Sequence, residues 1–231
     1  MSPSSDTLEI HTRRDVEATT IWLHGQGASS EDLIPLFKNL TGSRELGLRY
    51  LAPDAPMRLT RAYGNRPGRV WYDMASEDST EPDPETLEET RNRLASLLDT
   101  ERQQGMSSGK TMIGGFSQGA AVALHAGLQY PHALAGIIML SGEVIDPENL
   151  EKRVHAANAT TPILMIHGEH DSLVPLGEAE ANRDRLRSMG FPVDWHSLPL
   201  DHEISMETIG IVDQWIRARL EEQGITANQD D

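Results

Sequence analysis

The residues best suited to chemistry in this chain form a Gly-x-Ser-x-Gly pattern, Gly115-Phe116-Ser117-Gln118-Gly119. An apolar run precedes the pattern and small residues follow it, as at a junction between a strand and a helix. The glycines permit a sharp turn, because a Cβ would collide with neighbouring backbone, and the helix would direct its positive end at the serine. The pattern predicts that Ser117 is a nucleophile in a strand–turn–helix elbow.

A serine nucleophile needs a histidine to take its proton and a carboxylate to orient that histidine. In proteins with this elbow, the acid and then the histidine follow the serine along the chain. Asp171 comes shortly after the apolar run Ile163–His167, and His202 follows the apolar run Val193–Leu198. Both residues are expected at the carboxyl ends of strands, where the active-site loops of parallel sheets gather. We therefore predict Ser117, Asp171 and His202 as a catalytic triad.

Other residues could take some of these roles. Glu169 is a second candidate acid, and His196 is the other histidine that follows Asp171, although it falls within a predicted strand. His24 could be an additional base, but a histidine that braces a loop is the favoured interpretation. A metal site is also conceivable, although its spacing does not match the HExxH motif, and we expect no metal. Its ligands would be His167, Glu169, His170 and Asp171.

Two backbone N–H groups should stabilise the oxyanion that forms during acyl transfer. One belongs to the residue after the nucleophile, which is Gln118. The second is expected from Leu23, at the end of an apolar run, with the glycine-rich loop Gly25–Gly27 as the alternative.

Composition limits the class of protein. The 231 residues contain no cysteine, which excludes disulfides and thiolate chemistry and suits a cytoplasmic location. No signal peptide or membrane span is evident. The net charge of −16, with three lysines against 17 arginines, disfavours binding to nucleic acid or anionic membranes. An ordinary acidic enzyme and an enzyme adapted to a salty cytoplasm would both have such a charge.

Alternating apolar runs and helical patterns predict an α/β fold, with a mostly parallel sheet covered by helices on both faces. No linker divides the chain, so we expect a single domain over residues 1–231, with flexible ends at 1–7 and 224–231. The expected strands are Leu8–Thr12, Thr19–His24, Leu48–Ala52, Thr111–Phe116, Ala135–Ser141, Ile163–His167 and Val193–Leu198. The expected helices are Glu31–Asn39, Pro84–Gln104, Gln118–Gln129, Glu178–Met189 and Ile204–Glu222, with a weaker one over Asn149–Ala157. The long region Pro53–Glu81 shows no regular pattern.

Six motifs occur in the order seen in one family. They are LHGQGAS at 23–29, APDAP at 52–56, WYD at 71–73, GGFSQGA at 114–120, HGEHDSLVP at 167–175 and DHEIS at 201–205. The chain resembles the carboxylesterase/acyl-protein thioesterase family, also called the phospholipase/carboxylesterase family, of α/β-hydrolases. The resemblance extends from about Thr19 to Arg219.

The resemblance implies the same triad and the same two oxyanion donors. It also implies a channel that binds the acyl group. Leu173 and the loop Pro53–Trp71, including Trp71 itself, would shape this channel. Members of the family hydrolyse short- to medium-chain esters, some hydrolyse thioesters of S-acylated proteins, and several form dimers. They need no cofactor, so the implied partner is a small-molecule ester or thioester. An alternative of another class is a binding protein on a hydrolase scaffold that has lost turnover.

The chain departs from the family pattern in places that leave the implied chemistry unchanged but affect the expectation for the substrate. Gln26 stands where leucine or methionine is frequent, and Ala120 replaces a second glycine after the elbow. The loop between Met57 and Val70 contains four arginines: Arg58, Arg61, Arg66 and Arg69.

Overall fold

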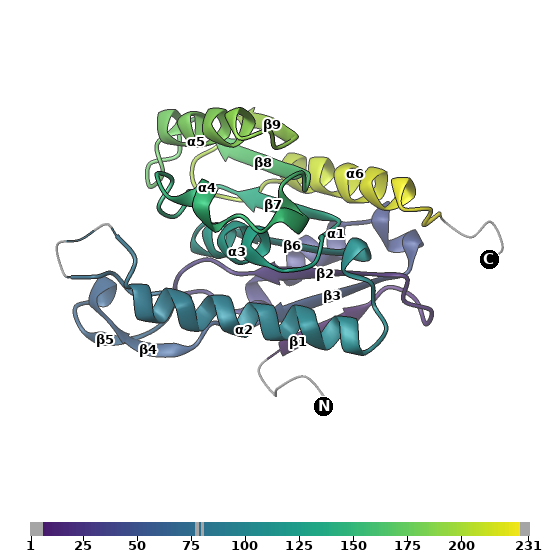
Figure 1. Ribbon diagram of the computed structural model, residues 1–231, viewed down its shortest axis with the longest axis horizontal. Coiled ribbons are helices and arrows are strands. Elements are labelled where there is room, and N and C mark those ends of the chain that lie inside the picture. The colour runs from purple at the N-terminus through teal and green to yellow at the C-terminus, as the bar shows by residue number, and fades with distance from the viewer. Residues whose placement is uncertain (1–6, 77–78, 80, 227–231) are drawn as a thin grey trace.

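A seven-stranded sheet forms the centre of the computed structural model, which describes residues 7–76, 79 and 81–226 (Figure 1). The strand order is β1-β3-β2-β6-β7-β8-β9, and all neighbours are parallel except β1, which pairs antiparallel with β3. The bounds are β1 Thr7–His11, β2 Ala18–Leu23, β3 Leu48–Pro53, β6 Thr111–Phe116, β7 Gly136–Leu140, β8 Ile163–Gly168 and β9 Val193–Leu198. The mostly parallel sheet predicted from the sequence is confirmed.

Helices cover both faces of this sheet (Figure 1). One apolar cluster joins the sheet to α2, α3, α4 and α5, and a second cluster joins the opposite face to α1 and α6. Strands such as β7 are buried at every position, which explains their continuous apolar runs in the sequence. The bounds are α1 Ile34–Asn39, α2 Pro84–Gln103, α3 Gln118–Gln129, α4 Leu150–Arg153, α5 Leu176–Ser188 and α6 Met206–Glu222.

Side-chain caps set the beginnings of two of the helices. The carboxylate of Asp83 accepts the N–H groups of Glu85 and Thr86 at the beginning of α2. Ser205 and Thr208 form a capping box that begins α6, two residues later than the pattern predicted. This cap ends the loop that contains His202, so it limits the conformations that the loop can adopt.

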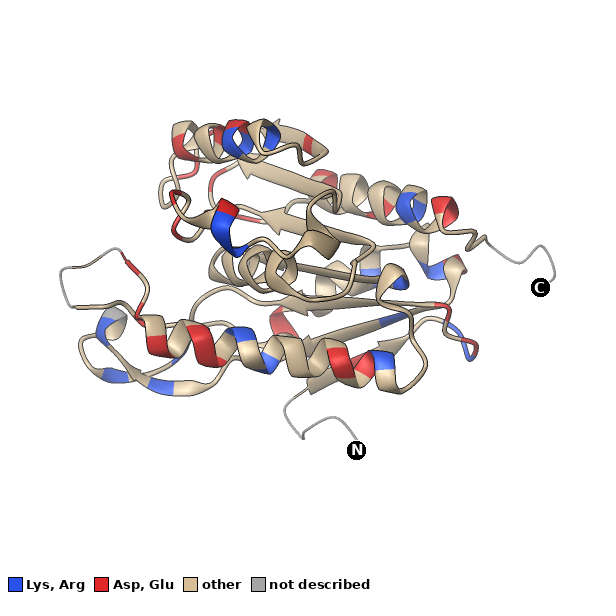
Figure 2. Cartoon of the chain, in the orientation of Figure 1, with Lys and Arg blue, Asp and Glu red and all other residues tan. Residues whose placement is uncertain are grey.

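The region Pro53–Glu81, expected to be irregular, contains an antiparallel hairpin of β4 (Met57–Thr60) and β5 (Arg66–Arg69). Gly64 and Asn65 form its turn, with φ values of 62° and 58°. Arginines of the hairpin lie near acidic residues, as the blue and red segments at the beginning of α2 illustrate (Figure 2). The ion pairs are Arg58–Glu89 at 2.7 Å, Arg61–Asp73 at 3.3 Å and Arg69–Asp54 at 2.9 Å.

Other boundaries also differ from the expectations. Thr7 already belongs to β1, and Ile225 is 1% exposed with its N–H bonded to the oxygen of Leu220, so these two positions are fixed. Residues 1–6 and 227–231 lie outside the described part of the chain. The weak helix predicted at Asn149–Ala157 divides into α4 and a 3₁₀ turn, Ala156–Asn158. The single domain stays a prediction.

Candidate active site

Ser117 lies at the junction of β6 and α3, in the strand–turn–helix context that the sequence predicts. Its φ of 54° and ψ of −124° are unusual for a residue with a Cβ, and its N–H donates to the oxygen of Leu140 at 2.9 Å. The flanking glycines are required: a Cβ on Gly115 would lie 2.5 Å from the carbonyl carbon of Gly119, and a Cβ on Gly119 would lie 2.1 Å from the oxygen of Leu23. Strain at a surface turn of this kind is typical of a nucleophile elbow.

Asp171 and His202 are in direct contact. Nδ1 of His202 lies 2.8 Å from Oδ2 of Asp171, while Oδ1 accepts the N–H groups of Leu173 and Val174 at 3.0 and 2.8 Å. Burial alone would raise the pKa of Asp171, but the hydrogen bonds from Val174, His202 and Leu173 lower it below its usual value. Asp171 is therefore a carboxylate at neutral pH and favours the His202 tautomer with its proton on Nδ1, which leaves Nε2 able to accept a proton.

Asp201 joins the loop of the acid to the loop of the histidine. Its Oδ1 accepts the N–H and hydroxyl of Ser172 at 2.9 and 3.0 Å, and the N–H of His202 at 2.8 Å. These hydrogen bonds lower the pKa of Asp201. Sequence reasoning did not assign this residue a role, and the available signal was its place directly before His202.

Phe116, the residue before Ser117, packs against His202. The rings of Phe116 and His202 lie 4.8 Å apart, and Phe116 is the last residue of β6. The strands β6, β7, β8 and β9 are successive neighbours in the sheet. All three predicted triad residues therefore lie at the carboxyl edge of one set of parallel strands.

The alternative residues have other contacts. Glu169 is exposed and accepts the hydroxyl of Ser197 at 3.2 Å, and His196 is exposed on β9. His167 is buried, with Nε2 2.8 Å from the oxygen of Val174. Among the described residues, no three histidine or carboxylate side chains are placed to share a metal ion.

His24 has the contacts of a brace. Its Nδ1 lies 2.8 Å from the oxygen of Gly25, and its Nε2 accepts the N–H of Ala55 at 3.0 Å. Burial lowers the pKa of His24, although the hydrogen bond to Gly25 and the charge of Asp54 act in the opposite direction. A neutral side chain that uses both ring nitrogens on backbone groups fits the loop-bracing interpretation.

The predicted oxyanion donors lie on either side of the elbow. Gln118 is the first residue of α3, and Leu23 is the last residue of β2, with no exposed surface. The loop Gly25–Gly27 also approaches the serine, since a Cβ on Gly25 would lie 3.5 Å from Cβ of Ser117. Leu23 and the loop therefore both stay predictions for the second donor.

The two predicted substrate-binding residues, Leu173 and Trp71, differ in their exposure to solvent. Leu173 is 71% exposed beside Asp171, whereas Trp71 has no exposed surface. The indole N–H of Trp71 donates to the oxygen of His24 at 2.7 Å, and its ring lies 5.2 Å from that of His24. Trp71 thus supports the loop after β2 from beneath and does not form the outer wall of the site.

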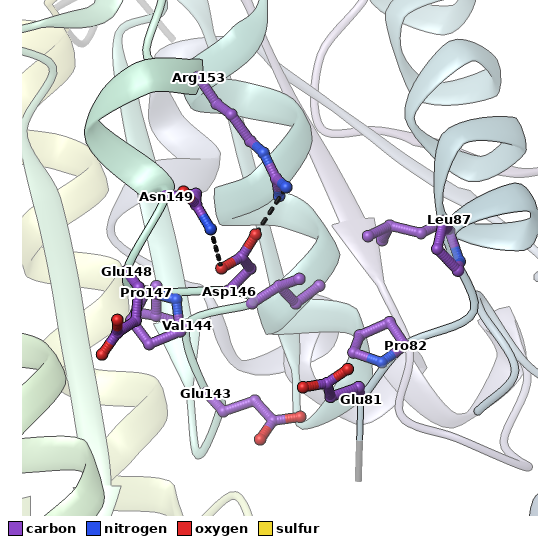
Figure 3. Close-up of a pocket in the computed structure, with 12 residues that line it drawn as sticks. Glu81, Pro82, Leu87, Glu143, Val144, Asp146, Pro147, Glu148, Asn149 and Arg153 are labelled. Carbon is purple, nitrogen blue, oxygen red and sulfur yellow. Dashed lines mark hydrogen bonds and ion pairs between the residues drawn. The ribbon is translucent and has the colours of Figure 1, made fainter. Parts of the chain in front are cut away.

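A cavity of about 560 Å³ lies between the beginning of α2 and the loop that follows β7 (Figure 3). No motif in the sequence had indicated a role for this loop. Gly142 connects it to the elbow, because a Cβ at Gly142 would lie 3.2 Å from the oxygen of Ser117. Apolar side chains and carboxylates share the cavity wall. Among the described residues that line it, the cation is Arg153, which is paired with Asp146 at 2.6 Å. The main lining residues are Pro82, Leu87, Glu143, Val144 and Asp146.

Comparisons with known proteins identify similar sequences and structures. A sequence model of the phospholipase/carboxylesterase family matches residues 7–220. Acyl-protein thioesterase 1 of Yarrowia lipolytica is 29% identical over 227 residues, which cover 95% of this chain and 100% of the relative.

Solved structures share the fold. The crystal structure of Arabidopsis thaliana SOBER1 is 27% identical, with a TM-score of 0.81 over 88% of this chain and 99% of that one. The crystal structure of Zea mays acyl-protein thioesterase 2 is 29% identical, with a TM-score of 0.80 over 93% of this chain and 98% of that one. The described helices include none long and apolar enough to cross a membrane.

Proposed function

Because the chain belongs to the phospholipase/carboxylesterase family of α/β-hydrolases, we propose that it is a serine hydrolase that cleaves short- to medium-chain carboxylic esters. The observation that carries the proposal is the contact of 2.8 Å between His202 Nδ1 and Asp171 Oδ2, in a loop that packs against the elbow of Ser117 through Phe116. An acid, a histidine and a strained serine at one edge of a sheet are the parts of a catalytic triad.

Each part has a defined task in this mechanism. Nε2 of His202 takes the proton of Ser117 as the hydroxyl oxygen attacks the ester carbonyl, and Asp171 stabilises the resulting imidazolium. His202 then gives the proton to the departing alcohol, which leaves an acyl-enzyme. A water molecule then gives a proton to His202 as its oxygen attacks the acyl-enzyme, and His202 returns the proton to the oxygen of Ser117 as the carboxylic acid departs.

The negative oxygen of each tetrahedral intermediate needs two preorganised donors. The N–H of Gln118 is one, and the second comes from Leu23 or from the loop Gly25–Gly27 that follows it. The loop lies against Ser117, as the position of Gly25 indicates, which supports a donor from this segment. Each donor contributes about 3 kcal/mol of transition-state stabilisation.

The substrate is a small-molecule ester or thioester, and no cofactor takes part in the mechanism. We place its acyl chain in the cavity beside the elbow, where Pro82, Leu87 and Val144 offer apolar surface. Leu173, which is 71% exposed and lies two residues after Asp171, stays a predicted substrate contact. A cytoplasmic location and a homodimer also stay predictions.

The serine is the decisive test. Ser117→Ala should abolish hydrolysis of p-nitrophenyl butyrate and labelling by a fluorophosphonate probe. Turnover by purified Ser117→Ala protein would overturn the assignment. A wild-type chain that neither turns over esters nor reacts with the probe would instead favour a binding protein on a hydrolase scaffold.

Acyl thioesterase activity is the second candidate, supported by the acyl-protein thioesterases among the similar proteins. Both reactions use the same residues, so the structure of the site does not separate them. Comparing kcat/KM for a butyrate ester and the matched thioester would do so, with a higher value for the thioester as the result that favours this candidate.

A further inference from the structure

The side chain of Gln118 forms hydrogen bonds to two other segments of the chain. Its Oε1 accepts the N–H of Trp71 at 2.8 Å, and its Nε2 donates to the oxygen of Tyr72 at 3.0 Å. The same Nε2 lies 3.4 Å from Oε1 of Gln26. Gln118 is only 7% exposed, so its amide has exchanged water for three protein partners.

These contacts permit only one orientation of the amide. A backbone N–H can only donate and a carbonyl oxygen can only accept, so Trp71 selects the oxygen of the amide and Tyr72 selects its nitrogen. A reversed amide would oppose like groups at both contacts. The side chain is therefore held at a fixed position relative to the Trp71–Tyr72 segment.

That segment, together with Arg69 just before it, is in turn bonded to the glycine-rich loop after β2 and to the residue that begins it. The N–H of Gly27 donates to the oxygen of Arg69 at 2.8 Å, and the indole N–H of Trp71 donates to the oxygen of His24 at 2.7 Å. On its other side, the segment is anchored to α2, because the hydroxyl of Thr90 donates to the oxygen of Trp71. Gln118 thus connects the elbow to the loop through a segment that is itself fixed.

We propose that the side chain of Gln118 is a positioning group for the oxyanion site, which sets the distance between the elbow and the loop Gly25–Gly27. The inference rests on the proposed function, with the second oxyanion donor in this loop. Two N–H groups must converge on one oxygen at 2.7–3.1 Å, and a displacement of about 1 Å can cost about 100-fold in rate. One residue then acts twice, through its backbone as a donor and through its side chain as the support of the opposite donor.

Gln118→Met tests the side chain alone. Methionine has a similar length and keeps the backbone N–H, but it cannot form the three polar contacts. We expect kcat for p-nitrophenyl butyrate to fall about 10- to 100-fold, with KM changed less than about threefold. The affinity for butylboronic acid, whose adduct with serine places an oxygen in the oxyanion site, should fall by a similar factor.

Gln129→Met is the matched control, because Gln129 lies on the same helix and, within the described part of the chain, its side chain donates to the oxygen of His125 alone. It should keep wild-type kcat. Near wild-type kcat in Gln118→Met, or a lower kcat with unchanged boronic acid affinity, would overturn the inference. The proposed function fails separately, if wild-type turnover does not depend on Ser117.

Gln118→Glu makes the positioning effect depend on pH, which a merely structural role of the side chain would not do. It also tests the inference if Gln118→Met does not fold. A protonated carboxyl group can accept from Trp71 and donate to Tyr72, whereas an ionised one would face the oxygens of Tyr72 and Gln26. We expect the ratio of variant to wild-type kcat to rise about fivefold or more between pH 8 and pH 6. A ratio that does not change with pH would overturn the inference.

Discussion

Oδ2 of Asp171 lies 2.8 Å from Nδ1 of His202, although 31 positions separate the two residues in the sequence. The contact depends on two loops that are bonded to each other: the N–H of His170 donates to the oxygen of Leu200 at 2.9 Å, and Asp201 accepts from both loops. The geometry of the proposed triad is therefore a property of paired loops at the ends of β8 and β9.

This contact predicts the effect of removing the negative charge of Asp171. Asp171→Asn should lower kcat for p-nitrophenyl butyrate about 10³- to 10⁴-fold, because the amide no longer favours the productive His202 tautomer or stabilises its charged form. Steady-state kinetics at pH 8 measures this effect. Glu169→Gln is the control, since the exposed Glu169 contacts Ser197, and it should stay within about twofold of wild type. The opposite pattern would make Glu169 the acid.

The sequence predicted the fold best where local pattern and tertiary packing agree. The bounds of β6 and α3 were predicted to the residue, because an apolar run ends at a turn that only glycines permit. The hairpin of β4 and β5 was missed, since Arg66–Arg69 contains proline and glycine and lacks β-branched residues. Its pairing depends on a turn with positive φ at Gly64 and Asn65.

The supports of the site could not be predicted, because they depend on contacts between distant segments. The side chain of Gln118 reaches Tyr72 across 46 positions, and Asp201 reaches Ser172 across 29. Trp71 was expected to contact substrate, and its complete burial follows only from the packing around it. Residue types at a given spacing indicate chemistry, but they do not indicate which polar groups hold the chemical groups in place.

Gly119, the last residue of the elbow pattern, should tolerate no side chain. Gly119→Ala places a Cβ 2.1 Å from the oxygen of Leu23 and 2.5 Å from that of His24, and both atoms are backbone. We expect loss of activity and a free energy of unfolding lower by at least about 2 kcal/mol, since backbone must move to relieve the overlap. Urea unfolding and the p-nitrophenyl butyrate assay measure the two effects.

A glycine in an open position provides the control for that change. Gly210 is exposed within α6, and a Cβ there would meet no atom within 4 Å. Gly210→Ala should raise the free energy of unfolding by about 0.5–1 kcal/mol, through the helix propensity of alanine, without changing kcat. Equal effects of the two substitutions would contradict the steric argument for Gly119.

His125 should make the folded chain sensitive to acid. It is buried within α3, and burial, together with the charges of Arg153 and Arg91, lowers its pKa to about 4 from 6.5. Between these values the unfolded chain binds more protons than the folded chain, so the free energy of unfolding should decrease as the pH falls from about 6.5 to about 4. The full contribution of this one residue is about 3 kcal/mol.

Urea unfolding at pH 7 and pH 5 tests this dependence. His125→Leu removes the titrating group, so its stability should decrease less between the two pH values than that of wild type. Among the described residues, Nδ1 of His125 has no hydrogen-bond partner, so the substitution leaves no partner of this atom unsatisfied. An unchanged dependence in His125→Leu would assign acid sensitivity to other groups.

The cavity between the beginning of α2 and the loop that follows β7 should limit the length of the acyl chain through Glu143, which lies on its wall (Figure 3). Partial desolvation raises the pKa of this carboxyl group, although the hydroxyl of Tyr72 donates to it at 3.2 Å. An alkyl chain laid against the carboxylate would remove more of its water, which costs free energy that a short chain avoids. Glu143→Leu should therefore increase kcat/KM for p-nitrophenyl octanoate relative to butyrate by about 3- to 10-fold, since added apolar contact stabilises the longer chain. Glu151→Leu is the control, because Glu151 is exposed on α4 and is not among the residues that line the cavity. An equal increase in the octanoate-to-butyrate ratio of kcat/KM in both variants would place the acyl chain elsewhere.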